Sequence, residues 1–125
     1  EEQEEHGMAE KSKVYFTREI TPESLINIYK ALGVELKGKI GVKISTGEPG
    51  VNNYLHQELI GELVRQLKGT IIECCTAYSG RRMDPAEHWK AIEEHGFKTM
   101  APCDIMDEFG EYRSKQKTVN LSCKK

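Results

Sequence analysis

The chain has 125 residues, of which 38% are hydrophobic, and its formal net charge is -2. This length suits one domain that buries roughly two-thirds of its unfolded surface, and it argues against a second independent core. No apolar run approaches the roughly 18 to 20 residues that span a bilayer, and no segment resembles a signal peptide. A soluble, cytoplasmic protein without membrane contact is therefore expected.

The two ends of the chain differ from its middle in composition. Residues 1–12 are polar and charged without periodicity, and we predict a disordered leader there. Residues 13–111 are predicted to form a single domain. Every charged side chain over 112–125 is basic, and we predict a flexible tail. Nucleic-acid binding is not expected, because no aromatic residues interleave with these charges to stack on bases.

The first half of the domain contains two predicted strands and one predicted helix. "KVYFT" at 13–17 indicates a short strand. Thr21 followed by Pro22 is a helix N-cap with proline in the first turn, and an apolar stripe continues to about Leu32. "GKIGVKIS" at 38–45 alternates as a strand does, with its isoleucine and valine residues on one face.

The second half repeats this alternation. A clean apolar stripe predicts a helix over 57–67, and "TIIECC" predicts a strand over 70–75. Asp84 and Pro85 repeat the cap-then-proline pattern, and the helix that they begin is predicted to end at Gly96.

The last predicted strand is "FKTMAPCDIMD" at 97–107, which Pro102 interrupts or ends. The sum is β-α-β-α-β-α-β. This order predicts an α/β fold with a mainly parallel four-stranded sheet, right-handed crossovers and helices packed on the sheet. An exposed sheet edge in so small a domain favours self-association, and a homodimer is expected.

Two long loops are the candidate ligand sites. In an open parallel sheet the ligand crevice forms outside the carboxyl ends of the strands. The strand-to-helix loops at 46–56 and 76–84 have about ten residues, whereas α/β connections typically have about 2 to 6. The candidate ligand-binding residues are Gly47, Glu48, Gly50, Asn52, Asn53, Tyr54, Thr76, Tyr78, Gly80, Arg81 and Arg82.

The chemistry of these loops favours a small anion. Exposed backbone amides before a helix bind anions, and the guanidinium groups of Arg81 and Arg82 make bidentate contacts with carboxylate or phosphate. Neither a phosphate-loop signature nor a dinucleotide-binding glycine pattern is present. A self-capped structural loop and solvated arginines are the alternatives.

Charged residues within the predicted strands give a further hypothesis. Lys43 and Glu73 are flanked by apolar residues, where a charge is energetically costly unless it is paired or lies at the mouth of a site. They could pair across neighbouring strands without any ligand. His88, beside Trp89, is either a catalytic group or a half-buried packing residue.

The cysteines and the last acidic residues suggest no complete metal site. The cysteines lack the two-residue spacing of zinc ribbons and ferredoxin clusters, and Cys74 and Cys75 suit small buried, reduced side chains. Asp104, Asp107 and Glu108 could bind a hard cation, or they form a charged turn. Cys75 has no histidine neighbour in sequence, so nucleophilic catalysis is unsupported.

Four segments together resemble a known family. "VKISTGEPGVNNYL", "ECCTAYSGRR", "EHWKAIEEHGF" and "APCDIMDEFGE" are similar, in order and spacing, to the bacterial and archaeal family called domain of unknown function 362, often labelled iron-sulfur-centre proteins. The resemblance covers about residues 13–111. The positions that match the family pattern are Gly47, Glu48, Gly50, Asn53, Tyr54, Thr76, Tyr78, Gly80, Arg82, His95, Gly96 and Phe97.

The resemblance also has limits that shape the functional expectation. Cys75 stands where the family usually has asparagine, and the ferredoxin-type cysteine motifs of longer members are not present, so no iron-sulfur cluster is expected from this chain. Two hypotheses remain. One is a small-anion or cofactor binding lobe of a longer protein, without a complete catalytic site of its own. The other is part of a redox or isomerase-like enzyme whose reactive centre lies in further sequence.

Overall fold

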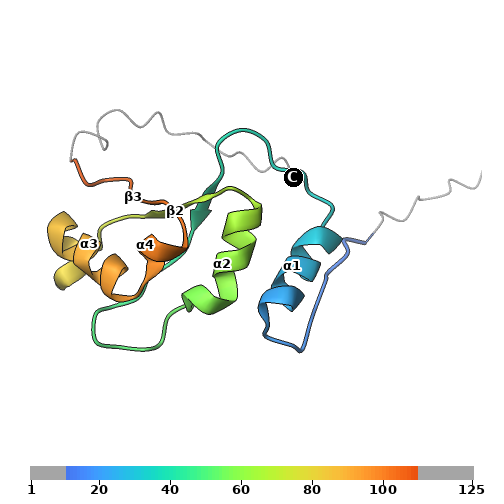
Figure 1. Cartoon of the computed structure of the whole chain (residues 1–125), viewed down its shortest axis with the longest axis horizontal. Helices are drawn as coiled ribbons and strands as arrows, with labels where there is room; N and C mark the ends of the chain where they lie inside the picture. Colours follow the sequence, from blue (N-terminus) through green and yellow to red (C-terminus); the bar gives the residue numbers. More distant parts are fainter. Residues whose placement is uncertain (1–10, 110–125) are drawn as a thin grey trace, which may run out of the picture.

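The computed structural model describes residues 11–109 of the chain. Its described part contains three strands, β1 (Gly41–Lys43), β2 (Thr70–Glu73) and β3 (Cys103–Ile105). They form one sheet in the order β1-β2-β3, and both neighbouring pairs are parallel (Figure 1). The α/β class and the parallel sheet are therefore confirmed, but a fourth strand is not.

Helices α1 (Pro22–Ala31) and α3 (Pro85–Glu94) begin where local capping predicts. In α1 the Thr21 hydroxyl accepts from the Ser24 amide, and the Ser24 hydroxyl accepts from the Thr21 amide. In α3 the Asp84 carboxylate accepts from the Glu87 amide. These caps satisfy backbone N–H groups that the first turn of a helix leaves free.

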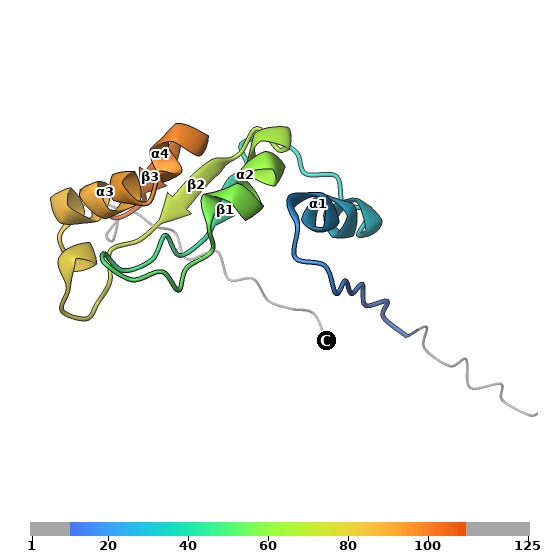
Figure 2. The same cartoon turned by 60° about the horizontal axis from the view of Figure 1, so that its bottom comes forward.

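The remaining helices complete the described elements. They are α2 (Gln57–Gln66), a short 3₁₀ helix η1 (Arg81–Met83) and α4 (Phe97–Met100). The unbroken order of the parallel strands places the β1-α2-β2 and β2-α3-β3 crossovers on the same face of the sheet, because both are expected to be right-handed. Figure 2 shows α2, α3 and α4 gathered around the strands, with α1 packed beside α2.

Two predicted strand segments are wrong. Residues 13–17 form no strand, and Val14 and Phe16 are exposed. Residues 97–100 form helix α4, because Gly96 adopts a left-handed φ of 77° and the chain then turns so that Phe97 and Met100 are buried on one side. Only the part of this segment after Pro102 pairs as a strand.

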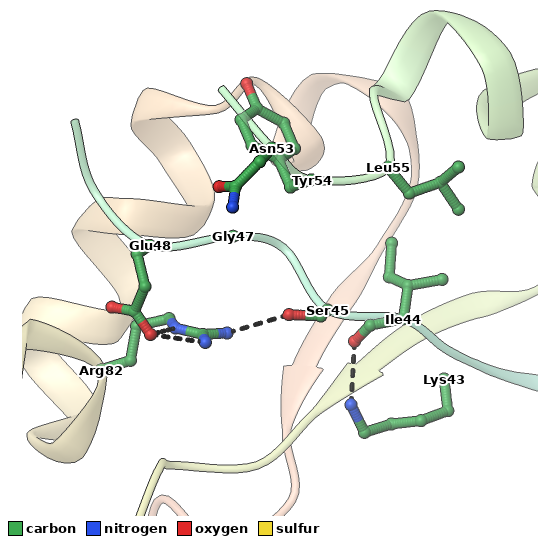
Figure 3. Close-up of a pocket in the computed structure, with 9 residues that line it drawn as sticks. All are labelled: Lys43, Ile44, Ser45, Gly47, Glu48, Asn53, Tyr54, Leu55 and Arg82. Carbon is green, nitrogen blue, oxygen red and sulfur yellow. Dashed lines mark hydrogen bonds and ion pairs between the residues drawn. The ribbon is translucent and has the colours of Figure 1, made fainter. Parts of the chain in front are cut away.

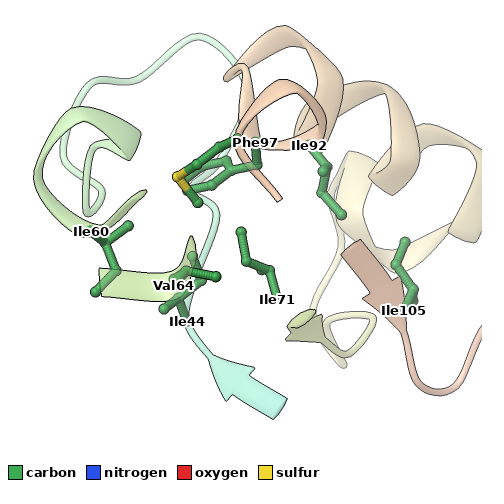
Figure 4. Packing of buried hydrophobic residues seen from close by; sticks show 8 residues of the cluster. Ile44, Ile60, Val64, Ile71, Ile92, Phe97 and Ile105 are labelled. Carbon is green, nitrogen blue, oxygen red and sulfur yellow. The ribbon is translucent and has the colours of Figure 1, made fainter. Parts of the chain in front are cut away.

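The core lies between the sheet and the helices that cover it. Ile71 of the central strand is fully buried, as are Val64 of α2 and Ile92 of α3 (Figure 4). Glu73 follows Ile71 by two residues, so it points toward the same helix-covered face and is 2% exposed. The fold thus places a carboxylate inside its core at the carboxyl end of the central strand.

The predictions for the chain ends lie outside the described residues. The leader was predicted over 1–12 and the tail over 112–125, and the structure describes neither residues 1–10 nor residues 110–125. The extent of the single domain stays a prediction. Within the described range, no helix has the length and apolar character needed to cross a membrane.

Candidate functional site

The loops that follow β1 and β2 meet at the carboxyl edge of the sheet. Between them is a cleft of about 480 Å³. Figure 3 shows the groups that surround it, which come from the end of β1, from the loop before α2 and from η1. The lining residues are Lys43, Ile44, Ser45, Gly47, Glu48, Asn53, Tyr54, Leu55 and Arg82.

Glu73 is the buried anchor beneath this cleft. Its Oε2 accepts from Lys43 Nζ at 2.8 Å. Its Oε1 accepts from the Thr46 amide at 2.7 Å and from the Thr46 hydroxyl at 3.0 Å. The Arg82 Nη1 group lies 3.4 Å from the same oxygen. The pairing of Lys43 and Glu73 across neighbouring strands, one of the sequence hypotheses, is therefore confirmed.

The environment of Glu73 keeps its carboxylate charged. Burial raises its pKa, but the donors bonded to it, chiefly the Lys43 ammonium and the Thr46 amide, outweigh burial and lower the pKa to about 2. A carboxylate with this pKa holds no proton near neutral pH. Glu73 therefore fixes the loop and its cations in place, and it is poorly suited to general acid-base chemistry.

His88 lies behind this carboxylate and is fully buried. Its Nε2 atom is 3.8 Å from Glu73 Oε1, which is longer than a hydrogen bond. Within residues 11–109, neither ring nitrogen of His88 has a hydrogen-bond partner. The histidine does not line the cleft, so the structure favours the packing alternative over the catalytic one.

Arg82 joins the two loops. Its Nε and Nη2 groups both donate to Glu48 Oε1, at 2.8 and 2.6 Å. Nη2 also donates to the Tyr78 hydroxyl, and Nη1 donates to Ser45 Oγ as well as to Glu73. These contacts use all five N–H groups of the guanidinium. Arg82 is thus saturated by the protein, which sequence reasoning did not anticipate.

Glu48 and Arg82 each stabilise the charged form of the other. The Arg82 guanidinium and the Tyr78 hydroxyl lower the pKa of Glu48 and outweigh burial, which raises it. Burial disfavours the charged form of Arg82, but Glu48 and Tyr78 outweigh it and raise the arginine pKa. Both groups are charged at neutral pH.

Arg81 does not join Arg82 at the cleft. It donates to Glu87 through Nε and makes a bidentate pair with Glu94 through Nη1 and Nη2. These contacts raise its pKa, chiefly through Glu94. Arg81 therefore ties η1 to α3, and the structure does not bring the two arginines together at the cleft.

Tyr54 forms one wall of the cleft inside an aromatic stack. Its ring lies between His56 and His95, with centroid separations of 4.5 and 4.1 Å. The Nδ1–H of His95 donates to the Thr46 carbonyl at 2.7 Å, which ties the end of α3 to the loop. Gly47 has a φ of 88°, and a Cβ atom there would lie 2.6 Å from the Tyr54 ring. Glycine at this position lets the tyrosine close the wall.

The other predicted site residues support the loops without lining the cleft. The Asn52 carbonyl accepts from the His56 ring, and the Thr76 hydroxyl donates to the Tyr78 carbonyl. Gly50 adopts a φ of 80°. Ser45 and Thr46 were not predicted, although a small hydroxyl residue directly after a strand is the signal that could have identified them.

No metal centre emerges from the described residues. Among them, no three His, Cys, Asp or Glu side chains come together as a possible metal site. Asp107 instead accepts from the Cys75 amide at 2.8 Å. Burial raises the pKa of both the Cys74 and the Cys75 thiols, so these cysteines favour the protonated form. Cys123 lies outside the described residues.

No family model matches the chain, and neither a curated protein nor a solved structure does. The resemblance to the domain of unknown function 362 family therefore stays a prediction.

Proposed function

We propose that this chain is a binding lobe for a small anionic ligand or cofactor, which it holds in the cleft between the two loops. The observation that carries the proposal is the position and chemistry of this cleft. It lies at the carboxyl edge of a parallel sheet, where α/β proteins commonly bind ligands, and its volume falls in the range of small-molecule sites.

Lys43 is the cation best placed to meet a ligand. Its side chain is 52% exposed, and it lines the cleft. One of its N–H groups donates to Glu73 and another to the Ile44 carbonyl, which leaves a third for a ligand. The buried Glu73 holds the ammonium in place, so little side-chain entropy remains to be lost on binding.

Two neutral side chains extend this donor surface. Ser45 Oγ accepts from Arg82, and its hydroxyl proton has no acceptor in the part of the chain that the structure describes, so it can donate to a ligand. The side chain of Asn53 also lines the cleft (Figure 3). An ammonium, a hydroxyl and an amide around one cleft are complementary to a carboxylate or a phosphate group.

Titration calorimetry with a panel of small anions tests this proposal. The panel extends from acetate and inorganic phosphate to citrate and a nucleoside diphosphate. At least one anion should bind saturably, and Lys43→Gln should weaken it about tenfold, as expected for the loss of one charged contact.

Lys90→Gln is the matched control. Lys90 pairs with Glu87 as Lys43 pairs with Glu73, but it does not line the cleft. The control should bind like the unmodified protein. Equal weakening in the two variants, or no saturable binding to any member of the panel, would contradict the proposal. The homodimer and the longer parent protein are separate predictions that this experiment does not address.

A further inference from the structure

Three hydrogen bonds converge on one oxygen of Glu48. The Oε1 atom accepts from Arg82 Nε, from Arg82 Nη2 and from the Tyr78 hydroxyl, at 2.8, 2.6 and 2.6 Å. Arg82 is nearly buried, with 8% of its side chain exposed, and it lines the cleft. Charged and neutral donors converging at these distances are the arrangement that proteins use to bind an oxyanion.

We propose that Glu48 is an internal stand-in for the ligand, and that an oxyanion of carboxylate or phosphate type displaces it from Arg82 and Tyr78. This inference rests on the proposed function and adds to it the subsite for the negative group and the element that controls access. Lys43 meets the ligand from the other side of the cleft, and Arg82 becomes available only when Glu48 leaves.

The contrast between the two carboxylates supports this assignment. Glu73 is 3% exposed in its side chain, and both of its oxygens have hydrogen-bond partners. The side chain of Glu48 is 35% exposed, and its Oε2 atom makes no hydrogen bond within the described residues. Glu73 is therefore built into the fold. Glu48 is held through one oxygen only, so an anion that offers two or more oxygens can replace it.

The backbone around Glu48 allows the exchange. Gly47 and Gly50 flank it with φ angles of 88° and 80°, a region that glycine enters without steric cost. The exchange also conserves charge. Lys43 and Arg82 balance Glu48 and Glu73 in the closed site, and the ligand's negative charge replaces that of Glu48 when its side chain moves into solvent.

Glu48→Gln tests the proposal because it should raise the affinity for an anion, whereas replacing a residue that contacts the ligand should lower it. Glutamine has the shape of glutamate but no charge, so Arg82 is left undercompensated. The affinity for inorganic phosphate, measured by calorimetry, should rise about ten- to hundredfold over the unmodified protein. Acetate in a parallel titration distinguishes a carboxylate preference from a phosphate preference.

Glu62→Gln is the matched control, because it also releases an arginine. Glu62 pairs with Arg65 at 3.0 Å on the exposed surface of α2, away from the cleft. If Glu62→Gln raises phosphate affinity as much as Glu48→Gln does, the effect is one of net charge and the proposal is wrong. An unchanged affinity in Glu48→Gln would also overturn it.

Side-chain NMR locates the bound anion. In Glu48→Gln, phosphate should shift the Nε–H signal of Arg82 and leave that of Arg65 in place. Adding Tyr78→Phe, which removes an exposed hydroxyl donor, should then lower the phosphate affinity severalfold. If the Arg82 signal does not respond to phosphate, the subsite assignment is wrong.

The outcomes separate the two proposals. Binding to the unmodified protein that Glu48→Gln leaves unchanged would retain the binding lobe and reject the stand-in. Phosphate could instead bind at Arg82 in Glu48→Gln and not bind the unmodified protein at all. That outcome would support the anion subsite at Arg82. It would reject the proposal that the unmodified chain functions by binding anions.

Discussion

Replacing Glu73 by glutamine should destabilise the protein in a way that depends on pH. The substitution removes the carboxylate that holds the Lys43 ammonium, the Thr46 amide and one edge of the Arg82 guanidinium. Loss of one partner from a fully buried ion pair typically costs about 3 to 5 kcal/mol, and the cost should lie at the lower end here because the Lys43 side chain is 52% exposed and Arg82 keeps Glu48. Glu73→Gln should therefore lower the free energy of unfolding by several kcal/mol near neutral pH.

The pH dependence follows from the pKa of Glu73. That pKa is about 2 in the folded protein, against the ordinary value of 4.5. A folded-state pKa below the unfolded value stabilises the folded state at pH above 4.5, and this contribution disappears as the pH falls toward 2. The difference corresponds to roughly 3 kcal/mol at neutral pH, of which about 2 kcal/mol should be lost by pH 3.

Urea unfolding at pH 7 and pH 3 measures this effect. The stability gap between the unmodified protein and Glu73→Gln should be large at pH 7 and smaller at pH 3, because at pH 3 the Glu73 carboxylate becomes almost fully protonated when the protein unfolds. Exposed carboxylates such as Glu62 titrate in both proteins and cancel in the difference. A gap that is the same at both pH values, or a variant more stable than the unmodified protein, would refute the reasoning.

Three further substitutions test the local structure by thermal unfolding. Gly47→Ala should cost at least about 1 kcal/mol, since alanine disfavours the left-handed φ and its Cβ would meet the Tyr54 ring at 2.6 Å; an unchanged melting temperature would argue against this loop geometry. Asp84→Ala should cost about 1 kcal/mol through the lost cap of α3, whereas Asp84→Asn should keep most of the stability; equal losses would argue against the cap. Ile71→Ala should cost roughly 2 to 5 kcal/mol because Ile71 is fully buried in the central strand, and a loss well below this range would place it outside the core.

Helices α1 and α3 were predictable because their signals are local. Thr21 and Asp84 each cap a helix through a side-chain bond to the third residue of the first turn, and a proline follows each cap. The strands depend on partners far away in sequence, which alternation alone does not reveal. Residues 13–17 have the composition of a strand, but no strand among residues 11–109 pairs with them. Phe97 and Met100 are three residues apart, which is a helical spacing, although the alternation around them predicts a strand.

The part of the candidate site that could be predicted is the pair of charged residues within apolar strands. Lys43 and Glu73 lie in apolar strands, so their pairing followed from the cost of an isolated buried charge. The sequence does not predict that Arg81 and Arg82 bind different carboxylates. The two are adjacent in sequence, but the turn of η1 directs one toward Glu94 and the other toward Glu48. Whether an arginine is free or already paired depends on carboxylates 13 and 34 residues away.

The most direct test of the central claim is an amide NMR titration of the unmodified protein with the tightest anion of the panel. The claim is that anions bind in one cleft rather than at scattered surface cations. It predicts that signals from residues 45–55 and from Tyr78 to Arg82 shift together and saturate with a single dissociation constant. Shifts scattered over exposed lysines such as Lys90 and Lys98, without saturation, would contradict it.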